Sequence, residues 1–251
     1  MSEIFFIRHA EHTPKGDSNP IGLTEQGIEE ARIIGNKLSI AGDIDSICPD
    51  LPRFMSTATI ALDHNVPSTE INKLKTSFIE NKKIKINNNL EYKKVDDTPE
   101  FSRLMNNAYS NKQNLRFLYN HSSNFNNVKN PISTSDDMFK EISNIIGSTI
   151  HNSDTGNKLV CAREFFFPSF RAHMLEITKG QKNVSDYIDW YSEEIERNDF
   201  ARTMIAKIAI SRASGSIHTI KIADNYGEHE IGLRIHNPVD LRNIFNKENL
   251  C

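Results

Sequence analysis

The stretch Phe5-Phe6-Ile7-Arg8-His9-Ala10-Glu11 decides how the rest of the chain is interpreted. Its apolar part, which begins at Ile4, stops abruptly at an arginine followed by a histidine. This pattern is typical of a buried strand whose carboxyl end delivers polar side chains to a site. Arginine offers a planar fork of donors for phosphate, and a histidine ring nitrogen can act as a nucleophile. An isolated Arg-His pair more often lies on the protein surface without a specific role, so the interpretation depends on the remaining sequence.

The length and charge of the chain limit the classes of protein it can represent. Its 251 residues are enough to bury a core in one domain, so we expect a single domain over residues 1–251. We also expect an insertion or cap region around residues 75–155, where the chain is rich in Asn, Lys and Ser. The net charge of −3 gives no electrostatic reason to expect nucleic acid or an anionic membrane as a partner.

Metal, disulfide and membrane signals are weak in this sequence. The three cysteines, Cys48, Cys161 and Cys251, are widely spaced and show no metal-ligand pattern or disulfide framework. No apolar run is long enough to span a bilayer, and Arg8 interrupts the first apolar stretch before a signal peptide could form. We therefore expect a cytoplasmic protein without a metal site, and the sequence does not indicate its oligomeric state.

A second strand and a second arginine follow the opening stretch. Thr24 is a good helix N-cap with an acidic residue after it, and Gly35, inside this helix, is expected to pack closely against a sheet. Residues 43–48 form the next predicted strand, which we expect to pair in parallel with the first through a right-handed crossover. Arg53 then lies just beyond a strand end, before a predicted helix over residues 54–62. The carboxyl ends of parallel strands share one edge, where ligands bind.

Three motifs now resemble the histidine phosphatase superfamily, the phosphoglycerate-mutase-like group. They are Arg8-His9-Ala10-Glu11, Leu23-Thr24-Glu25-Gln26-Gly27, and Asp50-Leu51-Pro52-Arg53 with Thr57-Ala58, in the right order and at similar spacing over roughly the first quarter of the chain. The resemblance implies an α/β fold, a three-layer sandwich with a mainly parallel central sheet and helices on both faces. It also implies phosphoryl transfer on a small phosphorylated metabolite, as a phosphatase or a phosphomutase, through a phosphohistidine.

The resemblance assigns roles to residues in the three motifs and beyond. His9 would be the nucleophile, and Arg8 and Arg53 would bind the phosphoryl oxygens, which suits a reaction that depends on positioning and charge neutralisation. The glutamate that protonates the leaving oxygen in the family is best matched by Glu91, which follows Leu90 but lies later than the usual spacing. The alternative for Glu91 is a solvated loop glutamate.

The fourth element of the resemblance departs from the family pattern. Residues 158–162 read as a buried strand, which in the family leads into a second site histidine, but here Arg163 occupies that position. An arginine can bind a phosphoryl group but cannot exchange a proton with it. Two interpretations follow: a variant phosphatase with Arg8, Arg53 and Arg163 as its phosphate clamp, or a catalytically degenerate pseudophosphatase that binds a phosphorylated ligand or a protein partner. A third is that Arg163 pairs with Glu164 or another carboxylate and does no chemistry.

No metal or organic cofactor is expected, because the arginines would supply the neutralising charge. His229 and His236 invite a metal site, but we favour solvated histidines because no carboxylate or cysteine cluster accompanies them. The remaining predicted elements are helices and a hairpin. The helices cover residues 136–150, 169–177, a segment capped by Ser185, 201–210 and a short one from Asn237, and the hairpin strands cover 217–223 and 230–235.

Overall fold

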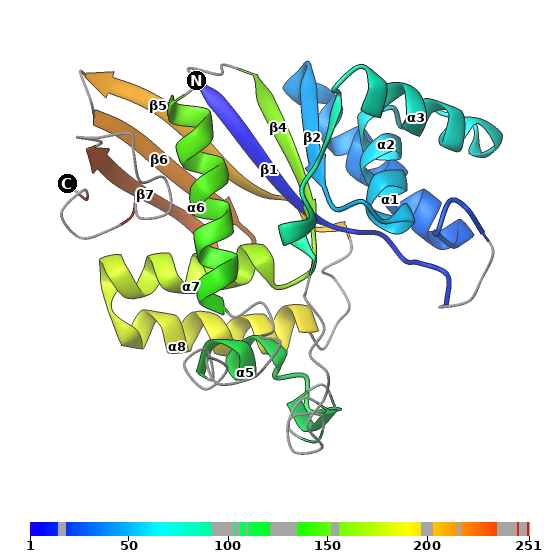
Figure 1. Ribbon diagram of the computed structural model, residues 1–251. Helices are drawn as coiled ribbons and strands as arrows, with labels where there is room; N and C mark the ends of the chain where they lie inside the picture. Colours follow the sequence, from blue (N-terminus) through cyan, green and yellow to red (C-terminus); the bar gives the residue numbers. More distant parts are fainter. Residues whose placement is uncertain are drawn as a thin grey trace.

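The computed structural model (Figure 1) describes residues 1–14, 19–91, 103, 106–108, 110–120, 135–151, 156–196, 203–214, 217–234, 245 and 250. Its centre is a seven-stranded sheet with the order β3-β2-β4-β1-β5-β6-β7. The first four strands in this order run parallel and the other three are antiparallel. The strands are β1 (Ser2–Arg8), β2 (Ile44–Cys48), β3 (Ile84–Ile86), β4 (Asn157–Ala162), β5 (Ala206–Ser214), β6 (Ile217–Asp224) and β7 (Gly227–Arg234).

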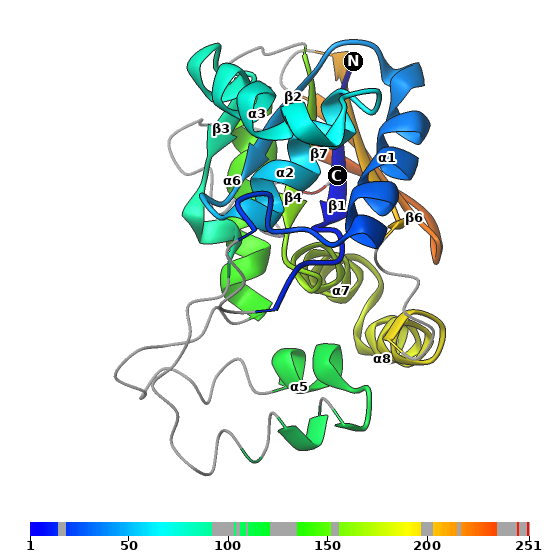
Figure 2. The ribbon, with the colours of Figure 1, turned by 90° about the vertical axis from the view of Figure 1, so that its right-hand side faces the viewer.

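Helices cover both faces of the sheet. Successive side chains of β1 point to opposite faces, so the strand packs against a different set of helices on each face. Phe5 and Ile7 lie in one apolar cluster with residues of α1 and α2, whereas Ile4 and Phe6 lie in the cluster formed with α6, α7 and α8. The α1, α2 and α3 group is clearly separate from α7 and α8 in the side view (Figure 2). The helices are α1 (Glu25–Leu38), α2 (Pro52–Leu62), α3 (Ile71–Glu80), α5 (Asn114–Asn120), α6 (Ser135–His151), α7 (Phe166–Lys179) and α8 (Gln181–Trp190), followed by a π-helical segment (Tyr191–Glu196).

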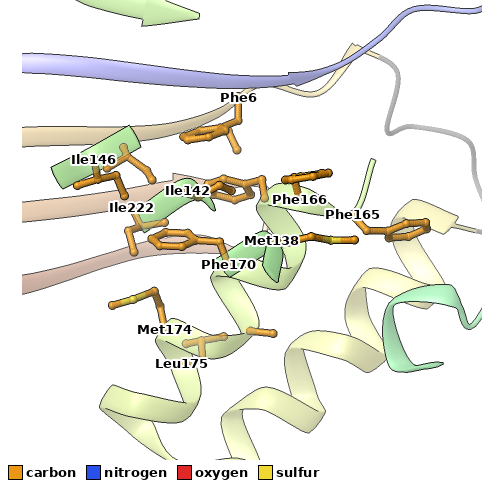
Figure 3. Close-up of a cluster of buried hydrophobic side chains, with 14 of the residues drawn as sticks. Phe6, Met138, Ile142, Ile146, Phe165, Phe166, Phe170, Met174, Leu175 and Ile222 are labelled. Carbon is orange, nitrogen blue, oxygen red and sulfur yellow. The ribbon is translucent and has the colours of Figure 1, made fainter. Parts of the chain in front are cut away.

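The larger apolar cluster ties the antiparallel half of the sheet to α6 and α7 (Figure 3). Phe6 of β1 and Phe167 of α7 have ring centroids 5.4 Å apart, and Phe170 is fully buried beside them. Burying a side chain of this size contributes roughly 2–3 kcal/mol relative to leaving it exposed. The cluster therefore fixes α7, whose first turn follows β4 directly, against the end of β1.

The α/β fold with a sheet that is parallel in its centre is confirmed, with helices on both faces. The expected direct pairing of the first two strands is wrong, because β4 lies between β1 and β2 and pairs in parallel with both. Gly35 packs against a helix and not against the sheet: a Cβ there would lie 2.9 Å from the Ala61 carbonyl oxygen of α2.

The helix predicted over residues 201–210 is wrong. The structure places strand β5 from Ala206, and this strand buries Ala206, Ile208 and Ile210 in the larger apolar cluster with period two. Isoleucines at alternate positions favour a strand, and pairing with β1 and β6 stabilises it. The helix assigned to Ser185 begins earlier, at Gln181. The predicted hairpin is confirmed as β6 and β7, whereas the short helix from Asn237 and the residue His236 lie outside the described residues.

No helix among the described residues is both long and apolar enough to cross a membrane.

A buried ion pair joins α7 to the turn between β6 and β7. Arg171 Nε lies 3.8 Å from Asp224 Oδ2, and the two side chains are only 2% and 1% exposed. Arg171 Nη2 also donates to the Gly227 carbonyl oxygen, and Asp224 Oδ1 accepts the backbone amides of Tyr226 and Gly227. Burial raises the pKa of Asp224, and the Arg171 charge and these amides oppose that rise.

The Asp224→Asn variant tests how much this ion pair contributes to the free energy of unfolding. It removes the negative charge and retains an oxygen for the two turn amides. It leaves the Arg171 guanidinium buried without a counter-charge, so we expect a loss of about 3–5 kcal/mol in the free energy of unfolding. The double variant Arg171→Met, Asp224→Asn should recover most of this loss, because no buried charge remains. Urea denaturation measures all three proteins, and a double variant no more stable than Asp224→Asn would contradict the assignment.

Candidate active site

Four neighbouring strand ends bring the predicted residues together. Arg8 ends β1 and His9 follows it, and Arg163 follows β4. Arg53 lies in the first turn of α2 after β2, and Glu91 follows β3 and a single 3₁₀ turn, Asn88–Leu90. The loops are joined by main-chain hydrogen bonds, from Arg163 N to the Leu90 carbonyl oxygen and from His9 N to the Ala162 carbonyl oxygen. The structure thus places all five predicted residues at the carboxyl edge of the parallel strands, where ligands bind in open α/β sheets.

His9 is held in one orientation by its own loop. The ring is 3% exposed, and its Nδ1 lies 2.9 Å from the Ala10 carbonyl oxygen. A carbonyl oxygen can only accept, so Nδ1 carries the hydrogen and Nε2 keeps its lone pair. The edge of the ring also packs against Phe54, with centroids 4.7 Å apart. This tautomer presents Nε2 as the nucleophilic atom.

The surroundings of His9 keep the ring neutral. Burial is the main cause that lowers its pKa well below the ordinary value of 6.5. The hydrogen bond to Ala10 opposes this shift, and the positive charges of Arg8, Arg53 and Arg163 lower the pKa further. All three guanidinium groups therefore act on the imidazole electrostatically, which is the condition a histidine nucleophile needs near neutral pH.

Thr57 connects residues 9–11, called the nucleophile loop after the role predicted for His9, to the second arginine. Its hydroxyl accepts a hydrogen bond from Ala10 N at 3.1 Å and donates one to the Arg53 carbonyl oxygen at 2.6 Å. Thr57 is fully buried, so water does not compete for these bonds. The first and third sequence motifs are thereby fixed to each other through one side chain.

Carboxylates hold the three arginines in place. Glu91 Oε1 accepts hydrogen bonds from Arg53 Nη2 at 2.7 Å and from Arg163 Nη2 at 3.1 Å. Arg8 Nη1 lies 3.0 Å from Glu164 Oε2. Each of these five side chains is between 19% and 33% exposed, so the cluster borders solvent. Arg163 pairs with a carboxylate, which is that of Glu91, and this pairing is compatible with each of the interpretations of Arg163.

Hydrogen-bonding capacity remains unused in this cluster. The Nε atoms of Arg8 and Arg53 and Glu91 Oε2 are buried and have no hydrogen-bond partner among the described residues. Beside them, a mainly apolar pocket opens between the ends of β1 and β4 and the start of α7. The site therefore combines anion-binding donors with an adjoining apolar recess, which is lined among others by Arg8, Arg163, Glu164, Phe167, Tyr191 and Met204.

The second motif supports the nucleophile loop from α1. Thr24 caps the helix by accepting from Gly27 N, and its hydroxyl donates to Glu11 Oε2 at 2.7 Å. Glu30, a nearly buried residue that the sequence analysis did not single out, accepts a hydrogen bond from Glu11 N at 2.8 Å. Its only sequence signal is an acidic side chain beside the apolar face of the helix. These contacts hold the chain that follows His9.

Of the two histidines considered for a metal, the structure describes only His229. His229 Nε2 lies 3.2 Å from the Thr178 hydroxyl, and His236 falls outside the described residues. The described residues contain no group of three or more His, Cys, Asp or Glu side chains arranged around a common point.

Gly27→Ala tests how closely α1 approaches the nucleophile loop. A Cβ at this position would lie 2.0 Å from the Glu11 carbonyl oxygen, which is backbone and cannot turn away. We expect a loss of about 3 kcal/mol in the free energy of unfolding, measured by urea denaturation. Asn36→Ala, at an exposed position of the same helix, should change stability by no more than about 0.5 kcal/mol. Equal stability of the two variants would contradict the close approach.

The protonation of His9 can be followed by NMR of its ring protons, with His9→Gln identifying the signal. We expect no titration of this ring between about pH 8 and about pH 6, because burial and three arginines disfavour the charged form. The folded-state pKa lies below the unfolded one, so the unfolded chain binds the proton first and the contribution of His9 to stability falls as the pH drops below about 6.5. A midpoint near the ordinary histidine value would refute the assigned environment.

Comparisons with known proteins were made for families, curated sequences and solved structures. No family model and no curated sequence matches the chain. Mycobacterial glucosyl-3-phosphoglycerate phosphatase is similar in structure, with a TM-score of 0.54 at 10% identity over 89% of this chain and 98% of that one. Its complex with VO3 gives a TM-score of 0.52 at 10% identity over the same shares. Mycobacterial hydrolase 1 gives 0.50 at 11% identity over 92% of this chain and 96% of that one.

These likenesses concern the fold. The glucosyl-3-phosphoglycerate phosphatase has the histidine phosphatase fold, and the present chain shares it over most of both lengths. The resemblance that three short motifs indicated at the start of the chain is therefore confirmed for the architecture: this chain has the fold of the phosphoglycerate-mutase-like histidine phosphatases.

Proposed function

We propose that this protein hydrolyses or transfers the phosphoryl group of a small phosphorylated metabolite through a phosphohistidine at His9. The observation that carries the proposal is the state of this residue: a buried, neutral imidazole whose Nδ1 donates to the Ala10 carbonyl oxygen while three arginine charges act on it. A nucleophile with a free Nε2 beside cationic donors is the arrangement that phosphoryl transfer requires.

In the first step, Nε2 of His9 attacks the phosphorus atom. The P–N bond forms as the bond to the leaving oxygen breaks, and Glu91 in its protonated form gives the leaving oxygen a proton. Arg8, Arg53 and Arg163 neutralise the charge on the equatorial oxygens. As the ring becomes cationic, its Nδ1–H bond to Ala10 becomes charge-assisted and stronger.

In the second step, water or another acceptor attacks the phosphohistidine. The P–N bond breaks, the ring returns to its neutral form, and Glu91 takes the proton of the attacking hydroxyl. Water gives a phosphatase, and a second hydroxyl of a bound metabolite gives a phosphomutase. The chemistry needs no metal or organic cofactor in this scheme, since the guanidinium groups supply the positive charge. The apolar pocket beside Arg8 adjoins the place where the organic part of the substrate would lie.

A second candidate function follows from Glu91. Its Oε1 is shared by Arg53 and Arg163, so the carboxyl group already serves as the hydrogen-bond partner of two arginines. A protein with this arrangement would bind a phosphorylated ligand or a phosphorylated partner without turnover, as a pseudophosphatase. Tight binding of the ground state does not by itself raise a rate.

His9→Ala distinguishes the two functions. In the wild type we expect turnover of p-nitrophenyl phosphate and of at least one compound in a panel of small phosphate monoesters. In the variant we expect a loss of about 10³-fold or more, because the covalent route is removed. Quenching the wild-type reaction should trap a phosphohistidine that survives alkali and is lost in acid.

His218→Ala, on β6 and away from the four strand ends, is the matched control and should keep full activity. If no phosphate ester is turned over while inorganic phosphate raises the melting temperature, the enzyme proposal is refuted and the binding function is supported.

A further inference from the structure

The 3₁₀ turn that precedes Glu91 is held from behind by a second glutamate. Glu141, in the middle of α6, accepts a hydrogen bond from Asn87 Nδ2 on Oε1 at 2.8 Å and one from Asn89 Nδ2 on Oε2 at 3.3 Å. Both carboxylate oxygens are thus engaged by side-chain amides, one from the residue before the turn and one from within the turn. Glu141 does not border the arginine cluster itself, and nothing in the three sequence motifs points to it.

The two asparagines transmit this contact to the backbone. The Asn87 side chain uses its amide nitrogen for Glu141 and its oxygen for Asn89 N, at 3.1 Å, so both ends of the group are occupied. Asn87 N donates to the Cys48 carbonyl oxygen at 2.8 Å, and Asn88 Oδ1 accepts from Asp50 N at 2.7 Å. The turn is therefore fixed on one side to the loop after β2 and on the other side to α6, and Glu91 comes immediately after it.

The chemistry of the contact requires a carboxylate. Two amide groups donate to it, and only an ionised acid offers two acceptor oxygens with no donor of its own. A glutamine would present one acceptor and one NH₂ group, so it could keep only one of the two bonds. The contact also borders a polar cavity lined by Asn87, Glu141, Asn144 and Ser148, so truncating Glu141 leaves no void in the apolar core.

We propose that Glu141 is a positioning residue for proton transfer by Glu91: through Asn87 and Asn89 it fixes the turn that places the Glu91 carboxyl group beside Arg53 and Arg163. This inference rests on the proposed function, because it assigns the proton donor of that reaction a dedicated support. Loss of the support lets the turn shift. A displacement of about 1 Å is enough to cost a proton transfer much of its contribution of roughly 10²–10⁴-fold.

The test compares two substrates that differ in their need for a proton. p-Nitrophenolate leaves without help, whereas the alkoxide of glycerol 2-phosphate must be protonated as it leaves. For Glu141→Ala we expect kcat/KM to fall by about 30-fold with glycerol 2-phosphate and by less than about 3-fold with p-nitrophenyl phosphate. Glu141→Gln should lie between the wild type and Glu141→Ala, because it keeps one of the two hydrogen bonds.

Two controls separate positioning from a general loss of structure. Lys140→Ala, at the preceding and exposed position of α6, should leave both substrates unaffected. Glu91→Gln should show the same selective loss with glycerol 2-phosphate. Adding Glu141→Ala to it should then cost less than about 2-fold more, because the residue that Glu141 supports is already disabled.

Equal losses with the two substrates, or no loss with either, would overturn the inference while leaving the proposed function intact. Full additivity of Glu91→Gln and Glu141→Ala would overturn it as well. If Glu141→Ala does not fold, the Glu141→Gln comparison decides the question. A wild-type protein that turns over no phosphate ester in the panel refutes the proposed function, and the inference with it.

Discussion

Three guanidinium groups that act on one imidazole repel each other, and the rest of the site is built to contain this repulsion. At a separation of about 4 Å, two like charges cost roughly 4 kcal/mol at an effective dielectric constant of 20. Glu91 bridges Arg53 and Arg163, and Glu164 pairs with Arg8, so the arginines are held in place before any anion binds. These five side chains keep one net positive charge. The site can thus attract an anion, while the two carboxylates neutralise most of the arginine charge.

The sequence resemblance predicts that Arg163 stands where the histidine phosphatases have a histidine. A histidine in the same place could be neutral or charged, whereas the guanidinium group is always charged and reaches further. In this structure it reaches Glu91. The carboxylate that would donate a proton is therefore also a structural counter-ion, and its two tasks compete. Each guanidinium group has further donors, so an anion can bind Arg53 and Arg163. The anion would then share the role of counter-ion with Glu91 and so relieve this competition.

The sequence was informative where chemistry and local structure coincide, and uninformative where distant segments meet. Arg8, His9 and Arg53 could be placed because they come at or just after predicted strand ends. Glu91 was proposed from the family resemblance, in which the proton-donating glutamate follows a leucine. The insertion of β4 between β1 and β2 could not be foreseen, because strand pairing joins segments more than a hundred residues apart. Strand β5 was mistaken for a helix because its alternation of alanine and isoleucine is short and both residues are apolar. Glu141 carried no signal, because its partners are two asparagines in a polar stretch.

Thr57 has a mechanical consequence for the site. Its single hydroxyl is bonded to the backbone on both sides, to Ala10 N in the nucleophile loop and to the Arg53 carbonyl oxygen in α2. The hydroxyl therefore couples the backbone next to His9 to the backbone of Arg53. Any change in the spacing between these two segments must break or stretch one of the two hydrogen bonds. Glu91 and Arg163 arrive on other loops and bring whatever adaptability the site has.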